Sequence, residues 1–302
     1  MNARGFSLIE LLIASALGAL LVVGAIGAYA HGRQLYDRSE RIARLHETAS
    51  YVFSALEPDL QLAGYYGFYT ASENISVPVV LPASLLACGS LSLEIALQGS
   101  DQRYSLPCPA NGGGAMDESD TVTVRRAAVE SAVPEHGRAQ IFTSRHSPAL
   151  QSLRLDGVLR TQLQAGEVEL RNLVVRTYYV ARRSDGNATT PALRVKSLGT
   201  IAGRPAFIDT EVMSGVEDLQ VEFGYVPDSR RSAAPMYVSP GLLPADAYLV
   251  AARLWLRLRS EEFDAGYRDQ RRYRYANQSF NAADHHQRVL VSRTVQLRNA
   301  RP

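Results

Sequence analysis

The feature that most constrains this chain is an uncharged stretch of 20 residues near its beginning, from Leu11 to Ala30. As a helix that rises about 1.5 Å per residue, it spans roughly 30 Å, the thickness of the hydrocarbon core of a bilayer. Arg4 precedes the stretch, so the positive-inside rule leaves Arg4 in the cytoplasm and everything after His31 on the other side. We therefore expect one membrane-spanning helix.

Glu10, at the start of this apolar helix, separates three interpretations of it. A carboxylate inside an apolar helix costs about 2.5–3.5 kcal/mol on insertion scales, so a plain membrane anchor has no reason to carry one. The second interpretation is a secretory signal peptide cleaved after Ala28-Tyr29-Ala30. The apolar region of such a peptide is usually only about 7–15 residues long, and Glu10 would lie inside it.

The third interpretation rests on the opening residues, Met-Asn-Ala-Arg-Gly followed by Phe-Ser-Leu-Ile-Glu, which resemble the leader of type IV pilins and their relatives. The resemblance implies that a prepilin peptidase cuts after Gly5 and that the new terminal residue, Phe6, is N-methylated. The α-amine of Phe6 would have an ordinary pKa of about 8 and would be a cation at the apolar end of the helix. Glu10 of one subunit can pair with the amine of the next, which offsets both desolvation costs and sets the axial register of a filament.

After Ala30 the helix is expected to continue as an amphipathic helix. Apolar residues recur at spacings of three and four and form one stripe: Ile42, Leu45, Ala49, Val52 and Leu56. A helix from Phe6 to Glu57 would contain 52 residues and be about 78 Å long. We expect Pro58, Gly64 and Gly67 to mark its end to within a few residues, with Pro58 stopping it early because proline has no backbone N–H to donate.

The remainder of the chain favours strands and turns, with no internal repeat and no long linker. The predicted strands are Thr121–Arg125, Leu173–Arg182, Leu193–Leu198, Leu219–Tyr225, Arg253–Arg259 and Val289–Leu297. We expect an α+β fold in which a long N-terminal helix, hydrophobic in its first half and amphipathic in its second, packs on a head of antiparallel sheets. The predicted segments are a leader over 1–5, a transmembrane or filament-core helix over 6–30, the amphipathic half over 31–62 and the head over 63–302.

Cys88 and Cys108 are the only cysteines of the chain. The predicted topology puts both in an oxidising compartment, where a disulfide is the default for a pair. Closing this loop would stabilise the head by roughly 3 kcal/mol in the chain-entropy model. Two cysteines are too few for a four-thiolate zinc site or an iron–sulfur cluster in one chain.

The sequence carries no enzyme signature, since it lacks a P-loop, a His-Glu-x-x-His motif, a Gly-x-Ser-x-Gly elbow and a dinucleotide fingerprint. We expect no catalytic residue, cofactor or metal. Asp117, Glu118 and Asp120 lack the spacing of a calcium loop and are expected to form a solvated loop. His285 and His286 are adjacent, and in a strand they would point to opposite faces, which disfavours a shared metal ion.

The stretch Arg271-Arg272-Tyr273-Arg274-Tyr275 mixes basic and aromatic residues, a combination that also grips single-stranded DNA. In a strand, however, Arg272 and Arg274 would share one face and Tyr273 and Tyr275 the other, as an ordinary half-buried hairpin requires. We therefore do not expect nucleic-acid binding.

Four further stretches resemble the PilW class of minor pilins, namely Ile42–Ala49, Leu56–Gly67, Arg176–Ala181 and Thr294–Asn299. The resemblance implies a minor pilin that takes part in starting the assembly of type IV pili, the pili of twitching motility, within a complex near the pilus tip. The implied partners are other minor pilins, the major pilin, the prepilin peptidase and a tip adhesin. The implied location is the inner membrane, crossed once with the head in the periplasm, and then the pilus at the cell surface. A J-type minor pseudopilin of type II secretion is the alternative, since it shares the leader, the rod and a sheet-rich head.

Overall fold

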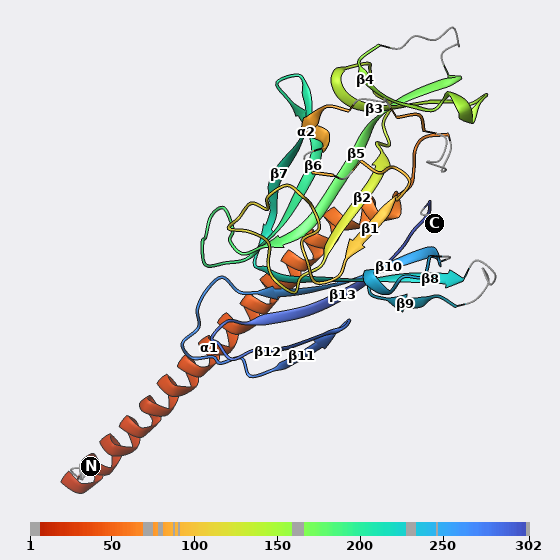
Figure 1. Ribbon diagram of the computed structural model, residues 1–302. Coiled ribbons are helices and arrows are strands. Elements are labelled where there is room, and N and C mark those ends of the chain that lie inside the picture. Colours follow the sequence, from red (N-terminus) through yellow and green to blue (C-terminus); the bar gives the residue numbers. More distant parts are fainter. Residues whose placement is uncertain are drawn as a thin grey trace.

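The computed structural model describes residues 7–68, 75–77, 81–86, 88–89, 91–158, 166–227, 234–245 and 247–299. One long helix runs from a free N-terminal end into a head built of antiparallel sheets (Figure 1). The predicted α+β fold, with a long helix packed on a sheet-rich head, is confirmed.

Helix α1 (Leu8–Gln61) contains 54 residues and is about 81 Å long. Its second half packs on the head through the predicted apolar stripe, of which Leu45, Val52 and Leu56 are at most 6% exposed. Ile42 is 42% exposed and lies one turn before Leu45, the first buried residue of the helix.

Pro58 does not stop the helix early, contrary to the expectation, because the helix continues to Gln61. Proline removes one backbone donor, but its carbonyl oxygen still accepts a hydrogen bond from the N–H of Leu62, at 3.2 Å. The two residues that follow, Asp59 and Leu60, are both buried against the head. Tertiary packing of this last turn therefore outweighs the lost hydrogen bond.

The first sheet has seven strands and is organised around one long central strand, β5 (Val168–Ala181). Along β5, residues 168–172 pair with β3, residues 173–178 pair with β2 and residues 176–181 pair with β6. The outer strands are β1 beside β2, β4 beside β3 and β7 beside β6. The bounds are β1 (Leu97–Ser100), β2 (Thr121–Ala127), β3 (His136–Ser144), β4 (Ser152–Asp156), β6 (Ala192–Ile201) and β7 (Arg204–Ser214).

The second sheet has the order β13-β10-β8-β9, and all of its pairs are antiparallel. A two-stranded hairpin, β11–β12, lies beside it (Figure 1). The bounds are β8 (Val216–Pro227), β9 (Met236–Val238), β10 (Ala247–Arg259), β11 (Arg272–Tyr275), β12 (Gln278–Asn281) and β13 (Arg288–Gln296). Three short helical turns complete the described elements: α2 (Ala83–Leu86), η1 (Pro148–Leu150) and η3 (Pro240–Leu242).

The main core forms where the second half of α1 meets both sheets. Strand β10 contributes Leu254, Leu256 and Leu258, all fully buried, and this confirms the inward face predicted from their alternation. The opposite face of β10 is also partly covered, because Arg257 lies under the hairpin with its guanidinium carbon 3.7 Å from the ring centre of Phe280. A second, smaller cluster of apolar side chains lies on the first sheet, around Tyr66, Ile141 and Val175.

Candidate functional site

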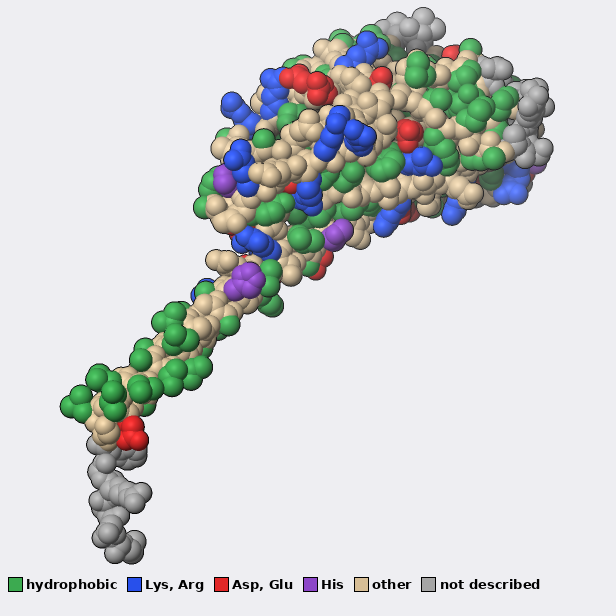
Figure 2. Space-filling model, turned by 90° about the horizontal axis from the view of Figure 1, so that it is seen from below, with side chains coloured by type: hydrophobic (Ala, Val, Ile, Leu, Met, Phe, Trp, Pro, Cys, Tyr) green, Lys and Arg blue, Asp and Glu red, His purple; other side chains and the backbone are tan. Residues whose placement is uncertain are grey.

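The first half of α1 lies outside the head, and its apolar side chains cover the free end of the helix (Figure 2). Every large aliphatic side chain from Leu8 to Ile26 is 55–76% exposed. Among the described residues, α1 is the one helix long and apolar enough to cross a membrane, and none of its apolar window is buried in the protein. An exposed apolar surface of this size marks contact with lipid or with other helices.

Glu10 lies in the first turn of α1 and is exposed. A carboxylate oxygen of Glu10 accepts a hydrogen bond from the backbone N–H of Ser7, at 3.0 Å. Such a contact satisfies one of the unpaired donors at a helix start, and the negative charge suits the positive end of the helix dipole. Gly5 and Phe6, the predicted cleavage and methylation positions, lie outside the described residues.

The end of α1 is attached to the first sheet by Asp59, a residue that the sequence analysis missed. Its carboxylate is 1% exposed and accepts hydrogen bonds from the guanidinium of Arg126, at 2.8 and 3.0 Å, and from that of Arg176, at 3.0 and 3.2 Å. The hydroxyl of Tyr178 is the third donor group and lies 2.6 Å from the carboxylate. Burial and the Asp59 carboxylate raise the pKa of the Tyr178 phenol, so it stays a neutral donor.

Two of the four stretches that resemble the PilW class meet here, since Asp59 lies in Leu56–Gly67 and both Arg176 and Tyr178 lie in Arg176–Ala181. A further one, Thr294–Asn299, lies beside them. The guanidinium of Arg293, one residue before it, lies 2.8 Å from Glu57, and the N–H of Arg298 donates to the carbonyl of Gln61 at 3.3 Å. Segments more than 100 residues apart in the sequence thus meet where α1 ends.

Gly64 shows how tightly the chain packs at this point. Its φ is +77°, and a Cβ at this position would lie 2.7 Å from the carbonyl oxygen of Asn299. Glycine therefore serves both the left-handed turn after the helix and the close approach of the C-terminal segment.

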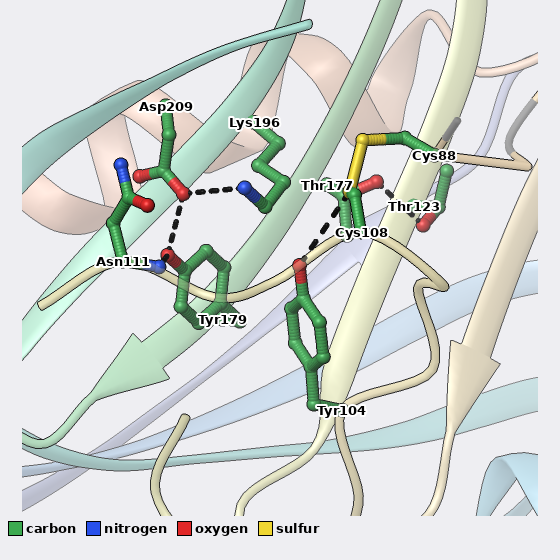
Figure 3. Close-up of a disulfide and its surroundings, with 9 residues drawn as sticks. All are labelled: Cys88, Tyr104, Cys108, Asn111, Thr123, Thr177, Tyr179, Lys196 and Asp209. Atoms are coloured by element: carbon green, nitrogen blue, oxygen red, sulfur yellow. Dashed lines mark hydrogen bonds and ion pairs between the residues drawn. A yellow bond between two sulfur atoms is a disulfide. The ribbon is translucent and has the colours of Figure 1, made fainter. Parts of the chain in front are cut away.

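Cys88 and Cys108 form the predicted disulfide, with their Cα atoms 4.7 Å apart (Figure 3). The bond ties the segment after α2 to the connection between β1 and β2. The hydroxyl of Tyr104 points toward the sulfur of Cys108, 3.9 Å away. The disulfide therefore fixes a long connection on the outside of the first sheet.

Beside this connection, Tyr179 links β5 to the neighbouring strands (Figure 3). Its hydroxyl donates to Asp209 at 2.7 Å and accepts from the backbone N–H of Asn111 at 2.9 Å. Lys196, the only lysine of the chain, lies 2.7 Å from the same carboxylate. Burial opposes ionisation of Asp209, but its contacts with Lys196, Tyr179 and Arg194 hold its pKa below the ordinary value.

The predicted solvated loop around Asp117, Glu118 and Asp120 is wrong for Asp120, which is 1% exposed. Its two carboxylate oxygens accept from the backbone N–H groups of Gln102 and Val221, both at 2.8 Å, and so connect the β1–β2 connection to β8 of the second sheet. Burial raises the pKa of Asp120 to about 7 in spite of these two donors.

The remaining candidates have structural contacts. Nδ1 of His285 lies 2.6 Å from the carbonyl oxygen of Tyr267, and Nδ1 of His286 lies 2.9 Å from that of Ser260. Among the described residues, no group of three His, Cys, Asp or Glu side chains is placed to hold a metal ion.

The hairpin has the predicted alternation. Tyr273 and Tyr275 are buried against the second sheet, whereas Arg272 and Arg274 are exposed. The hydroxyl of Tyr275 donates to buried Asp218 at 2.5 Å, so the aromatic face holds the hairpin on the sheet.

Comparison with known proteins gives two family matches. Residues 177–299 match the model of type IV pilus-assembly protein W, PilW, and residues 1–26 match the prokaryotic N-terminal methylation motif. None of the curated proteins matches the chain. Among solved structures, the chain is similar to a type IV-like pilin from Thermus thermophilus at 13% identity and a TM-score of 0.36, over 86% of this chain and 99% of that one. The predicted resemblances to the PilW class and to the methylated leader are confirmed by the two family models.

Proposed function

We propose that this chain, whose residues 177–299 match the PilW model, belongs to the PilW class of type IV pilus-assembly proteins and is a minor pilin that helps to start pilus assembly. The matched family consists of pilus components and not of enzymes. The observation that carries the proposal is the first half of α1, an apolar surface that the rest of the protein leaves exposed and that contains one carboxylate, Glu10.

In this proposal the same surface has two successive environments. Before assembly, residues 6–30 cross the inner membrane once, and the head lies in the periplasm, where an oxidising compartment keeps the Cys88–Cys108 bond. After a prepilin peptidase removes residues 1–5, the amine of Phe6 is methylated and the helix leaves the lipid for a bundle of pilin helices.

Glu10 sets the axial register of neighbouring subunits during assembly. Within one chain its carboxylate meets only the backbone N–H of Ser7, among the described residues. In a bundle it would exchange this contact for the charged amine of a neighbouring subunit, and a charge-assisted pair in apolar surroundings is stronger than the contact it replaces. The partners in this account are other minor pilins and the major pilin, with a place near the pilus tip beside an adhesin.

The proposal is tested by replacing Glu10 with alanine in the native cells. We expect Glu10→Ala to be processed normally, because the cleavage position is unchanged, and to fail to support piliation. Counts of surface pili and the size of the processed chain are the two readouts. The matched control is Glu47→Ala, which removes another exposed carboxylate of α1 outside the apolar half and should leave pili unchanged. Normal pilus numbers in Glu10→Ala would contradict the register argument.

A further inference from the structure

The first sheet extends past the end of α1, so part of one of its faces is uncovered (Figure 1). On β5, Tyr178 and Val180 are buried in the core beneath α1. Further toward the start of β5, Asn172, Val174 and Arg176 alternate along the same face and are only partly buried. The helix ends before the sheet does, and beyond its end Asn172, Val174 and Arg176 stay partly exposed on this face.

The uncovered face forms a groove with a volume of about 390 Å³, which we call the distal groove. It lies between Leu62 after α1, Arg126 of β2, Arg138 of β3, Val174 of β5 and Ser197 of β6. It is at the end of α1 opposite to the exposed apolar half, so a membrane that holds the apolar half is far from it.

The distal groove carries an excess of positive charge. Arg126 and Arg176 share one carboxylate, that of Asp59, which lies beneath the groove surface and is 1% exposed. The side chain of Arg176 is 40% exposed. Arg138 has no ion-pair partner within 4.0 Å among the described residues, and Glu130 is the only carboxylate that lines the groove there.

Apolar side chains lie between these cations. Leu62 and Val174 line the groove and are partly exposed, and Val129 beside them is 56% exposed. An apolar floor with arginines around it suits an extended peptide that carries both apolar and acidic side chains, because guanidinium groups bind carboxylates through paired hydrogen bonds. An acidic segment of a protein is therefore the ligand that complements the positive charge of the groove.

We propose that the distal groove binds an acidic segment of another protein of the pilus, one that lies beyond the head on the side away from the membrane. The proposal rests on the assignment of this chain as a pilin, since only then does a partner lie beyond the head. Arg138 pairs with the partner's carboxylate, and Arg176 supports it from the neighbouring strand.

Site-specific photo-cross-linking in the native piliated cells tests the proposal. A benzoylphenylalanine replaces Ser197 in the groove, and in a control strain it replaces Leu242, which is 73% exposed on η3 outside the groove. We expect a cross-link from position 197, but not from 242, to one protein other than this chain, and we expect the linked peptide to contain Asp or Glu side chains.

Substitution of Arg138 in the same strains tests whether the positive charge of the groove is needed for the cross-link. Arg138→Glu should reduce the cross-linked product about tenfold or more, because it sets like charges against each other, whereas Arg138→Lys should retain most of it. Since Arg138 makes no ion pair with any residue that the structure describes, neither substitution should change the thermal unfolding of the purified chain.

Three results would overturn the proposal: no product above that of position 242, a product linked to lipid or to a second copy of this chain, or a product insensitive to Arg138→Glu. The amount of this chain in sheared filaments is measured in parallel. If the chain is present in filaments and the cross-link is absent, the groove proposal fails alone, whereas absence from filaments counts against the pilin assignment.

Discussion

The two halves of α1 form one continuous helix, yet they differ in what surrounds them. In the first half the large aliphatic side chains are 55–76% exposed, whereas in the second half Leu45, Val52 and Leu56 are at most 6% exposed. The second half also ends on a buried carboxylate with three hydrogen-bonding partners. Packing on the head therefore explains the apolar residues of the second half. Those of the first half make no such contact, and in our proposal they meet lipid or other subunits.

This difference predicts that changes in the second half alter the stability of the head and that changes in the first half alter assembly. The largest effect is expected at Asp59. Asp59→Ala leaves Arg126 and Arg176 without their shared carboxylate, and breaking a buried pair costs about 3–5 kcal/mol of unfolding free energy. Denaturant unfolding of the full-length protein in detergent measures this loss of unfolding free energy.

The matched control is Glu57→Ala, two residues away on the same helix. Its ion pair with Arg293 is partly exposed, so its loss should cost about 0–1 kcal/mol. Equal losses for the two variants would mean that the Asp59 contacts do not hold the end of α1 on the sheet.

The next effect compares one leucine from each half. Leu56 is fully buried, and Leu56→Ala should destabilise the head by about 2–5 kcal/mol through lost burial and a residual cavity. Leu20 is 72% exposed, and Leu20→Ala should change the unfolding free energy of the head by less than about 0.5 kcal/mol. A large loss of stability in Leu20→Ala would show that the first half contacts the head after all.

A smaller effect concerns pH and belongs to the head alone. The pKa of Asp120 is raised to about 7 from an ordinary value of 3.8, so between these values the folded state binds more protons than the unfolded state. The contribution of Asp120 to stability is therefore full below pH 3.8 and is lost as pH rises toward 7.

Asp120→Asn keeps one acceptor oxygen and cannot ionise, so it should remove this part of the pH dependence. Glu217 and Asp284, whose pKa values are lowered, contribute the opposite slope at more acidic pH in both proteins, and the difference between the two unfolding curves isolates Asp120. If the unfolding free energies of the unchanged protein and of Asp120→Asn have the same slope between pH 4 and 7, the assignment to Asp120 is contradicted.

Periodic patterns in the sequence predicted those parts of the fold in which neighbouring residues alone decide which face of a helix or strand is buried. The apolar stripe of α1, the alternation of Leu254, Leu256 and Leu258 and the two faces of the β11–β12 hairpin are all confirmed. The edge strands β1, β4 and β9 were not predicted, because short strands depend on partners elsewhere in the chain more than on their own residues, and the longer strands β3 and β7 were missed as well.

The attachment of α1 could not be predicted for the same reason. Asp59 meets Arg126 and Arg176, which are 67 and 117 residues away, and nothing in a single sequence pairs them. The usable signal was an arginine inside a run of β-forming residues, as at Arg126, since such a side chain needs a buried partner. The error at Asp120 has a similar origin: an acidic residue beside glycines is ordinarily solvated, and here it meets backbone donors from a distant strand.

The most direct test of the central claim, that the first half of α1 enters a filament, is mass spectrometry of filaments sheared from the surface of native cells. The account predicts that this chain is present and that its N-terminal peptide begins at an N-methylated Phe6. The same peptide found only in the envelope fraction would favour the secretion pseudopilin and contradict a surface pilus. A chain that begins at His31 would contradict the account altogether, because the apolar half would then have been removed as a signal peptide.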